Sequence, residues 1–186
     1  MIQYLKYALA VPAVLWVVFL SSCARPQEKY LREMERMEQL LKADTTTSPD
    51  MQKADMLLKL YLEYAEKFAD DTLSPSCLFK AGELAFSVGR YEEAMGCFDK
   101  VQRYPRFVKC PDALFLQGFI ADGNLRNPER AKKYYSDFLE RYPDHPLAHD
   151  VRIMITQLTL SPEELIRSFR EAGKDSLSAD TSYVTP

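Results

Sequence analysis

The apolar positions of the chain follow two patterns, a continuous run near the start and helical spacing over most of the remainder. Residues 8–20 contain no charged side chain. Further on, apolar residues recur at spacings of 4, 3 and 4, as in the stripe formed by Tyr30, Met34, Met37 and Leu41. Such spacing places side chains on one face of a helix. The pattern therefore predicts an all-α protein preceded by a separate apolar segment.

Capping residues and prolines mark the predicted helix starts. A residue that caps helices precedes a proline at four places, namely Ser48-Pro49, Ser74-Pro75, Asn127-Pro128 and Ser161-Pro162. The chain has 11 prolines and only 6 glycines, which suits helices with defined breaks. We predict helices over residues 28–43, 50–69, 75–88, 91–104, 111–123, 128–142, 146–160 and 162–172. The polar, unpatterned tail over residues 174–186 is predicted to be disordered.

A repeat of 36 to 38 residues runs through the helical part. Gly82 and Gly118 are 36 residues apart, and Tyr104 and Tyr142 are 38 residues apart. Both tyrosines lie in an Arg-Tyr-Pro sequence. A period of this length is typical of solenoids built from pairs of helices.

One of these repeats resembles the tetratricopeptide repeat (TPR) in detail. With Pro75 as position 1, the residues at the TPR signature positions are Leu78, Gly82, Ala85, Gly89, Tyr91, Ala94, Phe98 and Val101. A second repeat starts at Pro111 and carries one extra residue before Ala131. The resemblance implies a right-handed α-solenoid of antiparallel helix pairs over residues 28–173, with its clearest repeats at residues 75–143.

The apolar run ends at a junction that resembles a bacterial lipobox. Lys6 gives the run a positive flank, and Leu20-Ser21-Ser22-Cys23 closes it. The run is shorter than the roughly 20 apolar residues that span a bilayer. The resemblance implies a lipoprotein signal peptide at residues 1–22, acyl chains such as palmitate on Cys23, and a lipidated tether at residues 23–27. Plain cleavage and a retained transmembrane anchor are the alternatives.

The residues after the lipobox indicate a location. Residue 24 is Ala rather than Asp, which in bacterial lipoprotein sorting favours the outer membrane. No acidic run follows Cys23, unlike in some surface-exported lipoproteins. We therefore expect a chain anchored in the outer membrane that faces the periplasm.

Charge and cysteine content narrow the classes further. The net charge is −3 and both signs are interleaved, so we expect no nucleic-acid partner. If Cys23 carries lipid, Cys77, Cys97 and Cys110 leave an odd number of thiols in an oxidising compartment. Because small thiols often pack in helical cores, we favour three buried cysteines. One disulfide with a free thiol is the alternative.

Catalytic motifs are missing from the sequence. There is no Gly-rich phosphate loop, no GxSxG motif and no frame for a Cys–His pair. His145 and His149 are four residues apart, but His145 precedes Pro146 and two ligands alone make a weak metal site. We expect no enzyme activity, no metal and no cofactor apart from the lipid on Cys23.

The TPR resemblance also implies a binding surface. In TPR proteins the first helix of each pair lines a concave groove, and the corresponding residues here are Phe79, Glu83, Phe86, Phe115, Phe119, Asp122 and Ile153. Phenylalanines separated by carboxylates suit a peptide that docks with apolar anchors. Alternatively, the N-terminal helix or the tail of the same chain covers the rings.

Together these features favour a non-enzymatic interaction scaffold, a lipid-anchored subunit of a bacterial cell-envelope complex with protein partners in the membrane or periplasm. The combination resembles the BamD-like TPR lipoproteins of the outer-membrane β-barrel assembly machinery and the TPR proteins associated with the Tol–Pal system. A cell-surface lipoprotein that binds a small ligand or a glycan is the alternative.

Overall fold

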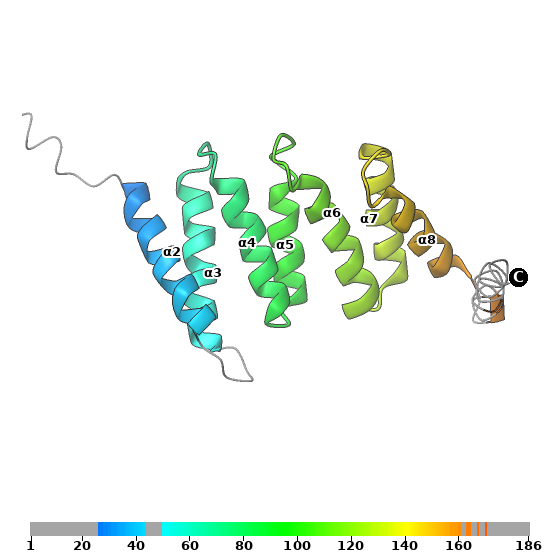
Figure 1. Cartoon of the computed structure of the whole chain (residues 1–186), viewed down its shortest axis with the longest axis horizontal. Coiled ribbons are helices and arrows are strands. Elements are labelled where there is room, and N and C mark those ends of the chain that lie inside the picture. Colours follow the sequence, from blue (N-terminus) through cyan, green and yellow to red (C-terminus); the bar gives the residue numbers. More distant parts are fainter. Residues whose placement is uncertain (1–25, 44–49, 161–162, 165–166, 168–169, 171–186) are drawn as a thin grey trace, which may run out of the picture. The chain divides into compact units, whose positions relative to one another are not determined.

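The computed structural model describes residues 26–43, 50–160, 163–164, 167 and 170, and every regular element in these ranges is helical (Figure 1). The elements are α2 (Pro26–Ala43), α3 (Met51–Lys67), α4 (Ser74–Ser87), α5 (Tyr91–Val101), α6 (Cys110–Phe119), the π-helix η1 (Ile120–Asn124), α7 (Pro128–Arg141) and α8 (Ala148–Thr159). The predicted all-α, TPR-like solenoid class is confirmed. The lipobox and the tail at residues 174–186 lie outside the described residues.

The helices belong to two compact units. Unit 1 ends at Arg90 and contains α2, α3 and α4, with α3 packed against both of the others. Unit 2 begins at Tyr91 and contains α5, α6, η1, α7 and α8, in which consecutive helices pack on one another. Within the described ranges, no helix is both long and apolar enough to cross a bilayer.

Most predicted helices agree with the observed ones within three residues, and two of the helix ends are informative. Helix α2 begins at Pro26, so the last two residues of the predicted tether are helical. Helix α6 ends at Phe119 and continues as η1, where the sequence predicted one helix to residue 123. The last predicted helix, at residues 162–172, lies mostly outside the described residues.

The π-helix accommodates the extra residue of the second repeat. A hydrogen bond in a π-helix spans one residue more than in an α-helix. In η1 the Leu125 N–H accordingly donates to the carbonyl of Ile120, five residues earlier, at 2.9 Å. The chain then turns at Arg126, whose φ is +50°. The Asn127 side chain accepts a hydrogen bond from the Arg130 N–H at 3.0 Å and so caps α7. The insertion thus changes the helix end without shifting the start of α7.

Buried aromatic rings contribute to the core of each unit. In unit 1 the buried Tyr64 lies 6.1 Å from Tyr30 and 5.0 Å from Phe68, measured between ring centroids. In unit 2 Tyr135 and Phe138 of α7 are fully buried. Burial of such rings supplies much of the hydrophobic stabilisation of a small helical unit.

The three cysteines lie in these cores as free thiols. Cys77, Cys97 and Cys110 are all buried. Burial raises the pKa of the Cys77 and Cys97 thiols to about 11, which keeps them protonated and unreactive at neutral pH. The expectation of packed, buried cysteines is confirmed.

Three helix connections share one hydrogen-bond pattern. In each, the connection begins at an aromatic residue whose carbonyl accepts a hydrogen bond from the N–H of the residue three positions further on. The carbonyl of this second residue accepts in turn from the N–H of the residue three positions after it. The pattern occurs over residues 68–74, 104–110 and 142–148, with N···O distances of 2.8 to 3.2 Å. The repeat seen in the sequence at Tyr104 and Tyr142 is therefore a repeat of backbone geometry.

Candidate protein-binding surfaces

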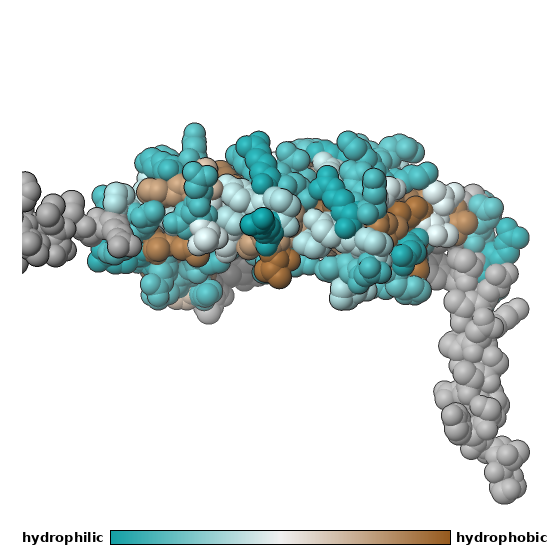
Figure 2. Space-filling view, turned by 90° about the horizontal axis from the view of Figure 1, so that it is seen from above, coloured by the Kyte–Doolittle hydropathy of each residue, from teal (hydrophilic) through white to brown (hydrophobic). Residues whose placement is uncertain are grey.

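The residues predicted to line a groove occupy different environments in the structure. Figure 2 shows a mostly hydrophilic face interrupted by separate hydrophobic patches. In unit 1, Glu83 is exposed and Phe86 is half-buried. Phe79 is only 3% exposed and lies in the core together with Leu78 and Ala81. The expectation that Phe79 faces a partner is therefore wrong, because burying its ring in the core removes that apolar surface from water.

Glu83 borders an open pocket on unit 1. The pocket has a volume of about 280 Å³ and is lined from three helices, by Glu38, Leu41 and Lys42 of α2, Leu57 and Tyr61 of α3, and Lys80, Glu83 and Leu84 of α4. The leucines make part of the lining apolar, and four of the other lining residues carry charge. This volume is at the lower end of ligand pockets and suits one apolar side chain of a partner better than a larger ligand.

A hydrogen-bonded group fixes one wall of this pocket. The Tyr61 hydroxyl donates to Glu38 Oε1 at 2.5 Å, and Lys80 Nζ lies 2.7 Å from the same oxygen. Partial burial opposes ionisation of Glu38, but the bonds from Lys80 and Tyr61 outweigh it and hold the pKa of this carboxyl below its usual range. Burial, together with the bond to Glu38, raises the pKa of Tyr61. In this wall, the charges of Glu38 and Lys80 therefore already compensate each other.

Sequence reasoning missed this wall. Glu38 and Tyr61 belong to α2 and α3, which precede the recognisable repeats and have no matching TPR positions. The sequence feature that points to this pocket is the apolar stripe of α2, because its last residue, Leu41, lines the pocket.

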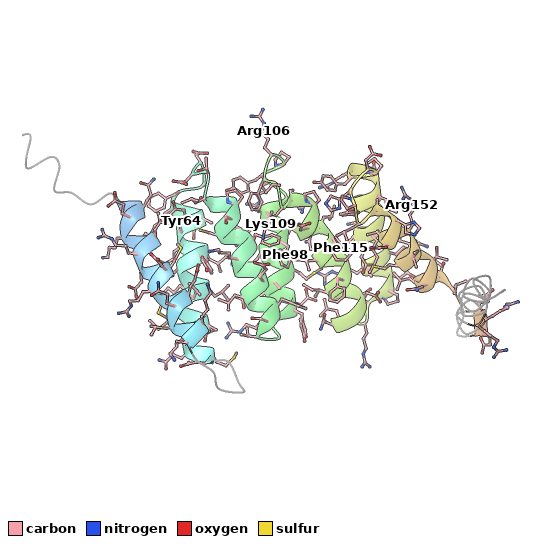
Figure 3. The ribbon with its side chains drawn as sticks, in the orientation of Figure 1. Tyr64, Phe98, Arg106, Lys109, Phe115 and Arg152 are labelled. Carbon is pink, nitrogen blue, oxygen red and sulfur yellow. The ribbon has the colours of Figure 1, made fainter. Side chains whose placement is uncertain are left out.

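Unit 2 carries an aromatic surface on α6. The rings of Phe115 and Phe119 are stacked, with centroids 6.4 Å apart and planes inclined by 29°. Phe115 is half-buried, on the α6 side that faces α7 (Figure 3), and its centroid lies 6.2 Å from Tyr135 and 6.3 Å from Phe138. Phe119 is 41% exposed. The inner ring is therefore held by the core, and it supports an outer ring that water can reach.

The other two predicted groove residues of unit 2 lie on different elements. Asp122 is half-buried in η1, directly after the aromatic surface in the chain. Ile153 is 44% exposed on α8. Pi-helical turns occur often at functional sites, and here η1 begins immediately after Phe119. That these residues bind a partner remains a prediction.

His145 is held by contacts within unit 2, whereas His149 is exposed on α8. His145 Nδ1 accepts a hydrogen bond from the Leu147 N–H at 3.2 Å, and its Nε2 lies 4.0 Å from Asp112. The ring also packs edge-on against Phe138. Across the part of the chain that the structure describes, no three His, Cys, Asp or Glu residues cluster as a metal site would require.

Comparison with known proteins identifies one repeat. Residues 112–145 match the tetratricopeptide repeat family, so the chain contains a TPR. The matched stretch covers most of α6, all of η1 and α7, and most of the connection to α8. No curated protein matches the chain. The fold and the repeat define a TPR-containing protein, a class that commonly mediates protein–protein interactions.

Proposed function

We propose that this chain is a non-enzymatic scaffold that binds an extended or helical segment of a partner protein. The observation that carries the proposal is the pair of stacked rings, Phe115 and Phe119, within the matched repeat. Apolar anchors that dock on such surfaces dominate the binding energy of many interfaces. Phe119 offers the contact area, and Phe115 keeps it rigid, which lowers the entropy lost on binding.

The pocket on unit 1 offers a second place for an apolar side chain. Its leucines would contact the side chain, while Glu83 and Lys42 of its lining would orient polar groups of the partner. Because Glu38 and Lys80 are already bonded to each other, they add little net charge. A segment with spaced apolar residues and mixed charges fits these features.

A lipid anchor on Cys23 is the second part of the proposal. The lipobox at residues 20–23 supports it. With α2 starting at Pro26, only two residues separate it from Cys23, and their extended reach is about 10 Å. Unit 1 would then be held next to the bilayer. Ala24 supports the outer membrane as the location, and the lack of an acidic run after Cys23 supports its periplasmic face.

This anchor narrows the partners to proteins that lie in or against the same membrane. A subunit role in an envelope complex, of the kind held by BamD-like lipoproteins or by Tol–Pal-associated TPR proteins, fits a short scaffold that is tethered so closely. The partner segment would be a part of a membrane-associated protein that reaches the α6 surface.

Photo-crosslinking in intact membranes tests the binding part. A photoreactive amino acid in place of Phe119 should trap one specific partner, while the same amino acid in place of the exposed Lys132 on α7 should not. Equal trapping at both positions, or none at either, would contradict the proposed surface.

The anchor is tested separately through Cys23→Ser. This variant should incorporate no labelled palmitate and should leave the membrane fraction or accumulate as an unprocessed precursor. Unchanged membrane retention of an uncleaved chain would show a transmembrane anchor instead.

A further inference from the structure

The three connections with the same hydrogen-bond pattern differ sharply in charge. Residues 68–74 include two aspartates, and residues 142–148 include Asp144 and His145. Residues 104–110 have no acid and include Arg106 and Lys109. Since the backbone pattern is the same in all three, the fold does not require cations at the middle connection.

The basic character extends beyond the turn itself. Between Asp99 and Asp112 the chain has four cations and no acid, and Lys100, Arg103, Arg106 and Lys109 recur every third residue. All four are exposed. Neither Arg103 nor Arg106 forms an ion pair with any residue that the structure describes. We call residues 100–109 the basic connection.

An apolar side chain stands at the tip of the basic connection. Val108 is 83% exposed, the largest exposed fraction among the large apolar residues described. The matching positions in the other two turns are Thr72 and Pro146, which are also exposed. An exposed valine at this position does not stabilise the fold, because the same turn forms with a threonine or a proline there.

The basic connection is held rigidly in unit 2. The Gln102 side chain donates to the Cys110 carbonyl at 3.0 Å and accepts from Arg141 at 3.0 Å, which ties the ends of α5, α6 and α7 together. Arg106 projects from the tip, away from the helices (Figure 3). Figure 2 looks from above onto the α5–α6 connection, and it shows hydrophobic surface beside strongly hydrophilic surface there.

We propose that the basic connection docks on an anionic lipid surface, with Val108 inserted among the headgroups. Arginine and lysine are attracted to anionic lipids, and an apolar tip between them gains by leaving water. A basic patch that supplements a lipid chain is a common second membrane signal. The choice of a lipid surface over an acidic peptide rests on the proposed anchor at Cys23, which keeps the chain at a bilayer.

The experiment uses the full-length chain, acylated at Cys23 and reconstituted into vesicles of phosphatidylcholine with or without about one third phosphatidylglycerol. Val108→Trp introduces a tryptophan at the tip, and Pro146→Trp is the matched control in the equivalent turn of the same unit. The only native tryptophan, Trp16, is removed with the proposed signal peptide. Trp emission and its quenching by brominated lipids report insertion.

The proposal predicts blue-shifted, quenched emission for Val108→Trp in anionic vesicles and solvent-like emission for Pro146→Trp. Each cation near an anionic surface contributes about fivefold, so adding Arg103→Gln and Arg106→Gln should lower the docked-to-undocked ratio about 25-fold. High salt should have a similar effect, because it screens these charges.

Two results would overturn the proposal, and they are distinguishable. If the basic connection does not dock, the chain floats with the vesicles but the two tryptophan variants show the same solvent-like emission. If the anchor is absent, the chain does not float with vesicles of phosphatidylcholine alone. An acidic protein that binds the connection would give the first result.

Discussion

A Cβ atom on residue 118 would lie 2.5 Å from Cδ1 of Tyr135, so glycine at this position lets α6 lie directly against the ring on α7. Both residues belong to the matched repeat, and both are buried. The contact sets the distance between α7 and α6, the helix that carries the aromatic surface. It therefore links the repeat signature to the proposed binding site.

Gly118→Ala should destabilise unit 2, because the added methyl group forces Tyr135 or a helix to shift. Overpacking of this kind costs about 1–3 kcal/mol. Urea unfolding measures it. The matched control is Gly96→Ala on α5, where an added Cβ meets nothing within 4 Å. This exposed helical site should gain about 0.5–1 kcal/mol. Equal effects of the two substitutions would refute the packing argument.

Tyr135→Phe should leave stability unchanged or raise it by about 1 kcal/mol, although it alters a fully buried residue. The Tyr135 hydroxyl is buried and has no hydrogen-bond partner among the described residues. Burial raises its pKa to about 12, so the lost group is a neutral hydroxyl. A loss of stability in urea unfolding would show that the hydroxyl is hydrogen-bonded after all.

Glu38→Gln should lower the melting temperature near neutral pH and have little effect in acid. The pKa of Glu38 lies below its unfolded value of 4.5, so its ionised form stabilises the fold above that value. This contribution disappears as the pH falls through the lower folded pKa. The melting temperatures of the two chains should therefore converge in acid, once the pH lies below the folded pKa of Glu38. A difference that stays constant with pH would contradict the bonded wall formed with Lys80 and Tyr61.

Gly89→Ala should destabilise unit 1 for a backbone reason alone. Its φ of +78° lies in the left-handed region, and an added Cβ would meet no atom within 4 Å. The expected cost is about 1 kcal/mol. Thermal unfolding measures it, and Gly89→Asn should recover part of the loss since asparagine tolerates this conformation. Stability equal to the native chain in Gly89→Ala would argue against the turn.

The sequence predicted what depends on local pattern. The start of α7 followed from its capping residue Asn127, whereas Ser74 is the first residue of α4 and does not cap it. The repeat followed from Gly118 and the two Arg-Tyr-Pro sequences. These features act through the backbone within one helix pair, so a single sequence reveals them. The extra residue before Ala131 was visible, but its absorption into a π-helix depends on packing against α7.

The candidate site was less predictable because exposure depends on neighbours. The TPR mapping treated Phe79 and Phe119 alike, yet one is in the core and the other is 41% exposed. The pocket was missed because Glu38 and Lys80 are 42 residues apart and meet only when α2 and α4 pack on α3. The basic connection escaped notice since its charges are diluted in a chain of net charge −3.

Co-purification from membranes in mild detergent tests the scaffold function most directly, with the full-length chain compared with Phe119→Asp and Lys132→Glu. A scaffold that binds through the α6 surface should retain a stoichiometric partner in the native chain and in Lys132→Glu, and should lose it in Phe119→Asp while its helical circular dichroism is unchanged. A native chain that purifies alone, or a partner that stays bound to Phe119→Asp, would contradict the proposed function.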